Sequence, residues 1–183
     1  MAYDRLDPLP IATPRTWLRR LSLADLADFQ AYRTDPEVGR WQGWTATGEP
    51  AARLYLTQNA ACALFVPGDW FQVGIALRSP DGRGPLIGDI GLCVDADDPA
   101  CGHIGFSLNR QWQGRGLATE AVAAARTLAF GPGGLQRLTA VTDTRNLASV
   151  QLLRRLGFRL EHTAAAVFRG EACQEHHFVA EAP

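Results

Sequence analysis

Two glycines separated by one residue, Gly114 and Gly116, lie where an expected strand passes through a loop directly into an expected helix. The first turn of a helix has backbone N–H groups without partners and carries the positive end of the helix dipole. Such a helix start binds phosphate groups, and glycine lets the backbone approach a ligand without an intervening Cβ. Ala118 is small and Thr119 adds a hydroxyl. Residues 113–119 therefore predict a phosphate or pyrophosphate site.

Two common nucleotide-binding patterns do not fit this loop. A P-loop ends in Gly-Lys-Ser/Thr, whereas this chain has no lysine, all 18 basic residues being Arg. The dinucleotide fingerprint has a third glycine where this chain has Thr119, and it follows a strand of a parallel unit. The remaining alternative to a ligand site is a tight turn rich in glycine. The lack of lysine also excludes a Schiff-base lysine.

A second pair of polar residues, Asn146 and Ser149, stands at the start of an expected helix over residues 147–156. Their spacing of three residues lets both side chains face one site. An amide and a hydroxyl there can bind a ligand or donate a proton. The structural alternative is capping, with Asn146 as the N-cap and Ser149 in the first turn. The two roles are compatible.

The elements that must position these residues alternate along the chain. Apolar periodicity, turn residues and glycines predict a mixed α/β fold, with helices first, then an antiparallel meander, then strand–helix–strand units. Expected helices cover residues 22–31, 35–37, 49–62, 117–130 and 147–156. Expected strands cover residues 17–21, 70–78, 86–95, 103–109, 135–142, 158–167 and 173–181, with a turn at 79–85.

Length and composition limit the function classes. A chain of 183 residues predicts a single domain over residues 1–183, with an irregular, proline-containing lead-in over 1–14. Its net charge of −1 argues against nucleic-acid and membrane-surface partners. No apolar run approaches the ~18 residues of a membrane helix, and the start does not resemble a signal peptide. We therefore expect a cytoplasmic protein.

The cysteines and histidines do not predict a metal site. The four cysteines form no CxxC pair, and no Cys/His spacing is typical of zinc. We expect free thiols in a reducing compartment. His176 and His177 alternate faces on a strand and cannot form a joint site by themselves. The cysteines are Cys62, Cys93, Cys101 and Cys173.

Together, the two motif segments resemble the GNAT superfamily of acetyl-CoA-dependent N-acetyltransferases. The first stands as Gln113-Gly-Arg-Gly-Leu-Ala118 and continues Thr-Glu-Ala, which looks most like the RimJ/RimL branch with its ribosomal-protein N-terminal acetyltransferases. The second is Asn146-x-x-Ser149 with a later Leu-Gly-Phe ending, and residues 35–38 before an aromatic stretch also fit. The resemblance spans about residues 17–178. It implies a GNAT fold: a central, mostly antiparallel sheet with a splayed parallel strand pair and flanking helices.

The resemblance also implies acetyl-CoA as co-substrate and no metal. In the family the cofactor lies where two parallel strands splay apart, here residues 103–109 and 135–142. The pantetheine arm pairs with the first strand as an added strand would, and the pyrophosphate binds the glycine loop. The residues expected to bind the cofactor are Phe106, Ser107, Leu108, Gln113, Gly114, Arg115, Gly116, Leu117, Ala118, Thr119, Asn146 and Ser149.

Acetyl transfer needs a neutral amine, a polarised thioester carbonyl and a proton for the leaving thiolate. By resemblance, Asn146 contacts the cofactor and Ser149 is the candidate acid that protonates the CoA sulfur. Many relatives carry a Glu where this chain has His103. A histidine there can act as the base, because its ordinary pKa is about 6.5; a structural histidine is the alternative. Asp89 is a second candidate base.

The acceptor is expected opposite the cofactor, under the N-terminal helices. Acidic groups there would attract a cationic amine and aromatic rings could hold it by cation–π contact, although core packing is the alternative for the tryptophans. The residues expected to bind the acceptor are Tyr32, Asp35, Glu37, Trp41, Trp44 and Asp89.

These expectations combine into an N-acetyltransferase, a monomer or homodimer, that transfers acetyl directly to a primary amine. The RimJ/RimL resemblance favours a protein or peptide N-terminal α-amine. A small-molecule amine, such as a polyamine, an antibiotic or an amino-acid analogue, is the alternative within the same fold. Another alternative is a non-catalytic acyl-CoA-binding regulatory module, which the missing strand Glu favours and the presence of Asn146 and Ser149 disfavours.

Overall fold

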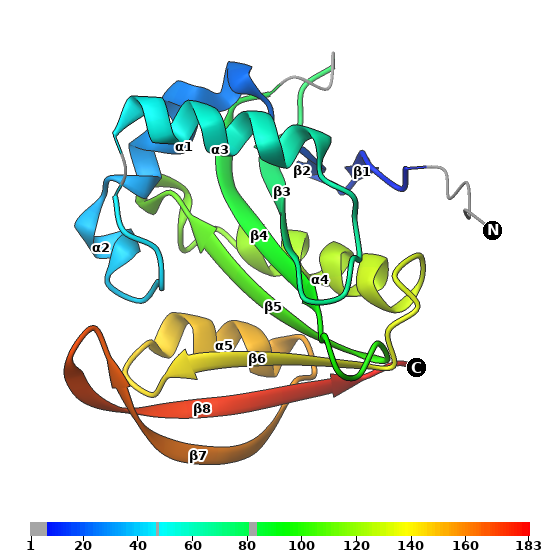
Figure 1. Cartoon of the computed structure of the whole chain (residues 1–183), viewed down its shortest axis with the longest axis vertical. Helices are drawn as coiled ribbons and strands as arrows, with labels where there is room; N and C mark the ends of the chain where they lie inside the picture. Colours follow the sequence, from blue (N-terminus) through cyan, green and yellow to red (C-terminus); the bar gives the residue numbers. More distant parts are fainter. Residues whose placement is uncertain (1–6, 47, 81–83) are drawn as a thin grey trace.

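The computed structural model describes residues 7–46, 48–80 and 84–183 as a layered α/β structure (Figure 1). In this part of the chain, eight strands form one sheet in the order β1-β2-β3-β4-β5-β6-β8-β7. Neighbouring strands run antiparallel except β5 and β6, which are parallel. The strands are β1 (Ile11–Ala12), β2 (Thr16–Arg20), β3 (Trp70–Leu77), β4 (Leu86–Val94), β5 (Cys101–Leu108), β6 (Arg137–Asp143), β7 (Arg159–Phe168) and β8 (Glu171–Glu181).

The helices cover the two faces of this sheet (Figure 1). α1 and α3 pack over β4 and the N-terminal strands, while α4 and α5 pack on the opposite face against β2, β5 and β6. Two short 3-10 turns precede α1 and α4. The helices are η1 (Leu23–Asp25), α1 (Leu26–Arg33), α2 (Pro36–Gly39), α3 (Glu49–Ala61), η2 (Arg110–Trp112), α4 (Leu117–Phe130) and α5 (Leu147–Arg155).

The parallel strands β5 and β6 are joined only at their beginnings. Their register pairs run from Cys101 with Arg137 to His103 with Thr139 and then stop. Beyond this point β5 stays paired with β4, and β6 stays paired with β8 up to Asp143. The two strands diverge in the middle of the sheet (Figure 1), and the edge of β5 that faces β6 is left without a strand partner.

Two hydrophobic clusters fix the helices to the sheet. The larger lies between the sheet and α4 and α5, with residues such as Ile104, Leu138 and Val122 fully or nearly fully buried. The smaller lies under α1 and α3 and includes Phe29 and Leu56. Because the clusters occupy opposite faces, the strands near the divergence are held in place from both sides.

A buried ion pair lies beneath α1. Arg33 Nη2 donates to Asp89 Oδ2 at 2.6 Å, and the Tyr32 hydroxyl donates to the same oxygen at 2.5 Å. The side chains of Arg33 and Asp89 are only 11% and 3% exposed. Burial, followed by the neighbouring carboxylate, raises the pKa of Tyr32 well above its ordinary value. This network ties α1 to the middle of β4.

The predicted elements are confirmed, with shifts of a few residues at their ends. The helix over 117–130 coincides with α4, and the meander of β3, β4 and β5 is antiparallel as expected. The lead-in expected to be irregular contains the two-residue strand β1, which pairs with β2. The turn at 79–85 and the first residues of the lead-in lie partly outside the described residues. All four cysteines are free thiols.

We predict that Arg33→Met lowers the free energy of unfolding by about 3–5 kcal/mol, because it leaves the Asp89 carboxylate buried without its cation. Denaturant unfolding measures this change. The control is Arg53→Met, which removes an exposed pair with Glu49 and should cost only about 0.3–0.5 kcal/mol. Equal losses in the two variants would show that the buried pair does not stabilise the fold.

Candidate functional site

The glycine loop between η2 and α4 depends on two left-handed residues. Gly114 has φ +73° and Gly116, the N-cap of α4, has φ +76°. A residue with a Cβ is strained in this conformation by about 1–2 kcal/mol. Around Gly114 the ideal Cβ position has no atom within 4 Å. The chain therefore turns sharply into α4 and leaves open space beside the first N–H groups of the helix.

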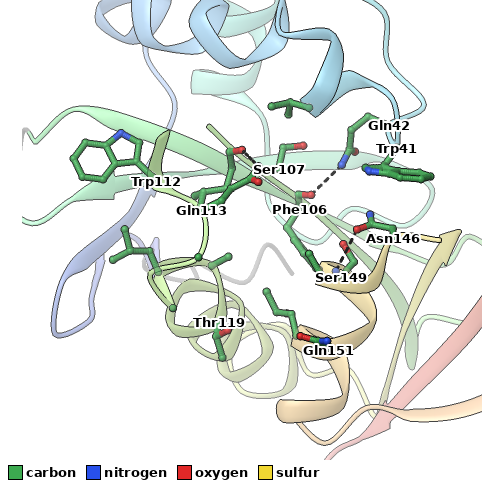
Figure 2. Close-up of a pocket in the computed structure, with 18 of the residues that line it drawn as sticks. Trp41, Gln42, Phe106, Ser107, Trp112, Gln113, Thr119, Asn146, Ser149 and Gln151 are labelled. Carbon is green, nitrogen blue, oxygen red and sulfur yellow. Dashed lines mark hydrogen bonds between the residues drawn. The ribbon is translucent and has the colours of Figure 1, made fainter. Parts of the chain in front are cut away.

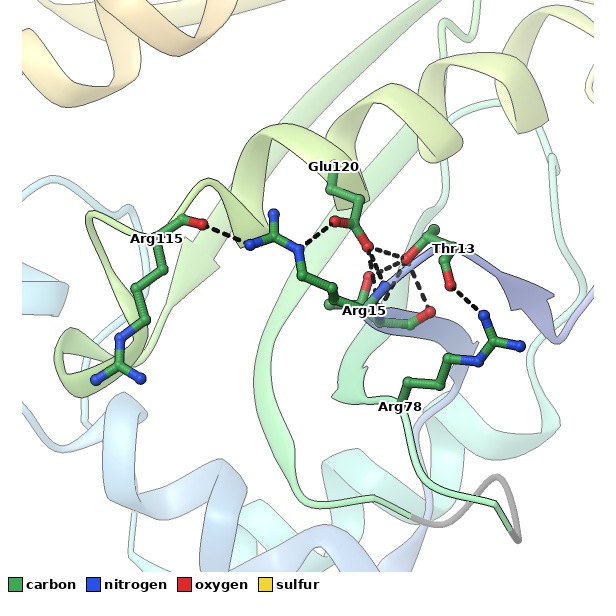
Figure 3. Close-up of polar contacts among 6 residues, drawn as sticks. Thr13, Arg15, Arg78, Arg115 and Glu120 are labelled. Atoms are coloured by element: carbon green, nitrogen blue, oxygen red, sulfur yellow. Dashed lines mark hydrogen bonds and ion pairs between the residues drawn. The ribbon is translucent and has the colours of Figure 1, made fainter.

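The start of α4 is held against the N-terminal strands by Glu120 (Figure 3). Its carboxylate accepts hydrogen bonds from the Thr13 hydroxyl at 2.5 Å, from the Arg15 backbone N–H at 2.7 Å and from Arg15 Nε at 2.8 Å. Arg15 Nη1 also donates to the carbonyl of Arg115, in the glycine loop, at 2.9 Å. These contacts fix the loop from the side away from its open space.

Burial alone raises the pKa of the Glu120 carboxyl, but the hydrogen bonds from Thr13 and Arg15 outweigh it. The pKa of Glu120 in the folded protein consequently lies below its ordinary value. A carboxyl group with a lowered pKa stabilises the fold most when it is ionised.

A cleft of about 440 Å³ opens beside this loop (Figure 2). It lies between the C-terminal half of β5, the glycine loop and the first turns of α4 and α5, and α2 and the segment after it close one end. Its wall brings together residues from both sequence motifs, although they lie about 30 residues apart. The predicted cofactor residues on this wall are Phe106, Ser107, Leu108, Gln113, Gly114, Gly116, Leu117, Ala118, Thr119, Asn146 and Ser149.

The free edge of β5 forms one side of the cleft. The N–H of Asn109 donates to the carbonyl of Ile87 on β4. Because backbone groups in an antiparallel strand alternate in direction, those of Leu108 and Phe106 point to the other edge of β5, away from β4. In agreement, the Phe106 carbonyl accepts from Gln42 Nε2 at 3.1 Å and the Leu108 carbonyl accepts from Gln113 Nε2 at 2.9 Å. Two side-chain amides thus donate to backbone carbonyls of β5 that would accept from a neighbouring strand if the sheet were continuous.

Asn146 and Ser149 stand on the opposite wall of the cleft (Figure 2). Asn146 is the N-cap of α5, and its side-chain oxygen accepts from the Ser149 N–H at 3.3 Å. The capping role considered from the sequence is therefore present. It uses the amide oxygen of Asn146 and leaves its NH₂ group and the Ser149 hydroxyl available on the cleft wall.

A second cleft, of about 330 Å³, lies on the other side of the divergence between β5 and β6. Trp41 and Gln42 border both clefts. His103 lines the second cleft, at the last register pair before the strands separate. Its Nδ1 lies 2.7 Å from Thr139 Oγ1 and its Nε2 lies 3.2 Å from Asp95 Oδ2.

The structure separates the predicted acceptor residues into two groups. Glu37 and Trp41 line the first cleft. Tyr32 and Asp89 do not line either cleft, because both are buried in the ion-pair network under α1. Trp44 packs against the cluster under α1 and α3, with the Arg33 guanidinium 4.5 Å from its ring centroid.

Two further predicted residues lie beside the cleft rather than on its wall. Asp35 caps α2 by accepting from the Glu37 N–H, and its carboxylate pairs with Arg110 at 3.2 Å. Arg115 extends over the ring of Trp112, with 4.9 Å between its guanidinium and the ring centroid.

Several wall residues of the first cleft were missed by sequence reasoning. Gln42 and Trp112 lie in loops where no periodic pattern identified them. Gln151 and Arg155 were included in the expected helix. They follow Ala148 by three and seven residues, a spacing that places all three on one helix face. The missed residues are Val38, Gln42, Trp112, Ala148, Gln151, Leu152 and Arg155.

The described residues hold neither a candidate metal site nor a candidate membrane helix. Within residues 7–46, 48–80 and 84–183, no group of three or more His, Cys, Asp and Glu side chains could hold a metal ion. No helix in the same ranges is long and apolar enough to cross a membrane.

Comparison with known proteins identifies the class to which this fold and site belong. The acetyltransferase (GNAT) domain family matches residues 15–159. The chain therefore belongs to the GNAT family of N-acetyltransferases, as the two motifs indicated. It is 28% identical to the uncharacterized N-acetyltransferase p20 of Bacillus licheniformis over 81% of this chain and 82% of that protein.

Solved structures share the fold at lower identity. A GNAT-family acetyltransferase from Bacillus anthracis has a TM-score of 0.81 at 19% identity, covering 94% of this chain and 98% of that one. RimL, a ribosomal L7/L12 α-N-protein acetyltransferase in complex with coenzyme A, has a TM-score of 0.77 at 18% identity and covers 93% of this chain and 96% of that one. The microcin C7 self-immunity acetyltransferase MccE, in complex with acetyl-CoA and AMP, has a TM-score of 0.78 at 16% identity and covers 97% of this chain and 98% of that one.

We predict that Glu120→Gln lowers the free energy of unfolding at pH 7 by about 1–3 kcal/mol, because the charged acceptor of several hydrogen bonds is lost. The difference from the unchanged protein should shrink as the pH falls below about 4.3, where the unfolded carboxyl is protonated, and vanish below the folded pKa. Denaturant unfolding at pH 7 and pH 3 measures both effects, with the exposed Glu49→Gln as control. A difference of the same size at both pH values would contradict this role.

Proposed function

We propose that this protein binds acetyl-CoA in the first cleft and transfers its acetyl group to a primary amine that enters through the second cleft. The observation that carries the proposal is the convergence of both motif segments and the free edge of β5 on one cleft. The glycine loop, at the N-terminus of α4, would bind the pyrophosphate through backbone N–H groups. Arg155, on the same wall, would add positive charge for a phosphate group.

The pantetheine arm would bind along the free edge of β5 as an added strand. Phe106 and Leu108 offer the backbone groups on this edge. The side-chain amides of Gln42 and Gln113, which bond their carbonyls, would have to move aside or hydrogen-bond the pantetheine arm as well. The thioester would then lie near Asn146 and Ser149, close to the boundary between the clefts.

The chemistry follows from these positions. The neutral amine attacks the thioester carbonyl carbon, the C–N bond forms, and the C–S bond breaks. Ser149 donates its hydroxyl proton to the departing thiolate and recovers one from the surrounding water. The Asn146 NH₂ group is available to hydrogen-bond the cofactor. No covalent enzyme intermediate is required.

The proton released by the amine needs an acceptor, and His103 is our candidate. A carboxylate such as Asp95 accepts hydrogen bonds, which assigns a proton to Nε2 and leaves Nδ1 facing the Thr139 hydroxyl. The Thr139 hydroxyl, which donates to the Gly102 carbonyl at 3.2 Å, would turn to donate to Nδ1 and would receive the amine proton in its place. Thr139 also lines the second cleft. Asp89, the second candidate from the sequence, is buried with Arg33 and is unsuited to this role.

For the acceptor class, we favour an α-amine at a peptide N-terminus on the likeness to RimL. A small-molecule amine is the second candidate within the same fold. A non-catalytic acyl-CoA-binding module is disfavoured by the Asn146 and Ser149 side chains on the cofactor wall. Acetyl-CoA turnover with an amine panel distinguishes enzyme from binding module.

We predict that Gly114→Glu weakens acetyl-CoA binding by about 10- to 100-fold, because no atom lies within 4 Å of an added Cβ there and the carboxylate would enter the open space proposed for the pyrophosphate. Isothermal titration calorimetry with acetyl-CoA, with NAD as comparator ligand, measures the loss. The matched control is Gly170→Glu in the β7–β8 turn, where φ is +81° and no atom lies within 4 Å of an added Cβ. It carries the same backbone strain away from the cleft. Unchanged affinity in Gly114→Glu would contradict the proposed binding loop.

We predict that Ser149→Ala lowers kcat by about 100-fold and leaves the dissociation constant of acetyl-CoA within about 3-fold, because it removes the acid and little binding surface. Steady-state kinetics with released thiol as readout, together with calorimetry, separates the two effects. A normal kcat would exclude Ser149 as the proton donor, whereas a parallel loss of affinity would assign it to cofactor binding.

A further inference from the structure

The second cleft has open space over Gly105 of β5, which forms part of its floor. Gly91 of β4 and Gly105 of β5 are register partners in the sheet. An added Cβ at Gly91 would come within 3.1 Å of the Trp70 ring, whereas one at Gly105 would meet no atom within 4 Å. Gly91 thus lets the tryptophan lie close to β4, and Gly105 leaves open space in the cleft that it lines.

Aromatic rings surround this open floor. Trp70 is a large hydrophobic side chain with 53% of its surface exposed, and its ring stacks on His103 with 6.5 Å between centroids. Trp41 and Phe168 line other parts of the same cleft. Exposed aromatic surface around a cavity favours a ligand with a flat apolar group.

One carboxylate in the cleft has no ion-pair partner within the part of the chain that the structure describes. Asp143 and Glu175 are register partners on β6 and β8, and both line the cleft. Asp143 accepts three hydrogen bonds from Arg145, one from its backbone N–H at 2.8 Å and two from its guanidinium at 2.9 and 2.6 Å. Over the described ranges of the chain, the Glu175 carboxylate has no hydrogen bond or ion pair, although Glu175 is partly buried. A carboxylate in this setting favours a cationic ligand.

We propose that Glu175 binds the ammonium group of the acceptor, and that the acceptor is a primary amine with a flat apolar group close to its nitrogen. That group would lie over Gly105 between the aromatic rings. This inference rests on the proposed function, since it names the substrate class of the second cleft. It makes Glu175 and Gly105 specificity-determining residues, whereas Asp143 remains paired with Arg145.

The first test measures binding without turnover. 2-Phenylethylamine is titrated by calorimetry into the protein saturated with CoA, with butylamine as the matched amine that lacks the ring. We expect 2-phenylethylamine to bind about 10-fold more tightly or better, because the ring buries more apolar surface. Equal affinities, or no binding of 2-phenylethylamine, would overturn the inference.

Two variants then test whether Glu175 binds the ammonium group. Glu175→Gln should weaken binding of 2-phenylethylamine by about 10- to 100-fold, because a charge-assisted hydrogen bond becomes a neutral one. Glu171→Gln, an exposed carboxylate on the same strand and outside the cleft, should leave affinity unchanged. Equal effects of the two variants would remove Glu175 from the site.

Gly105→Val tests the floor. A β-branched side chain suits a strand and has room at this position, so the fold and acetyl-CoA binding should persist. Binding of 2-phenylethylamine should fall by about 10-fold or more because the added methyl groups occupy the open space. Full retention of 2-phenylethylamine binding in this variant would contradict the proposed position of the ring.

The outcomes separate this inference from the proposed function. Binding of 2-phenylethylamine that depends on Glu175, without acetyl transfer to any amine, would support the site and contradict the enzyme mechanism. Transfer to aliphatic peptide N-termini with no preference for an aromatic group, and with no effect of Glu175→Gln, would support the enzyme and overturn the inference.

Discussion

The early end of the pairing between β5 and β6 is the constraint on which the rest of the site depends. Three register pairs hold these strands together, and then each continues with its outer neighbour alone. The backbone groups on the inner edge of β5 lose the partner that a continuous sheet would provide. One cleft lies on each side of the divergence, and Trp41 and Gln42 touch both. Molecules bound in the two clefts could therefore meet through the gap between the two strands, as the proposed transfer requires.

Charged anchors keep this opening in a fixed shape. The Arg33–Asp89 pair ties α1 to β4 on one face, and Glu120 ties the start of α4 to the residues before β2 on the other. Both anchors lie outside the clefts, so their charged groups hold the cleft walls in position without lining them. The cleft walls present backbone groups, amides, hydroxyls and aromatic rings, together with a few charged side chains such as Arg155 in the first cleft and Glu175 in the second.

Local patterns predicted the elements, and they marked several residues that line the first cleft, because glycine, proline and helix-start residues report local conformation directly. Gly116 and Asn146 are the N-caps of α4 and α5, and the sequence marks the starts of both helices clearly. The acceptor residues were harder, because their positions depend on contacts between distant segments. Tyr32 and Asp89 lie 57 residues apart and form a core hydrogen bond that no local pattern records. Glu175 became a candidate only when the sheet register placed it beside Asp143.

Amide hydrogen exchange along β5, with and without acetyl-CoA, tests the central claim most directly. Phe106 and Leu108 face the open edge, whereas Ser107 faces β4 and provides an internal control. We expect acetyl-CoA to slow exchange at Phe106 and Leu108, together with N–H groups of residues 113–119, and to leave Ser107 nearly unchanged. Binding of acetyl-CoA without protection at the open edge would contradict the placement of the cofactor between β5 and β6.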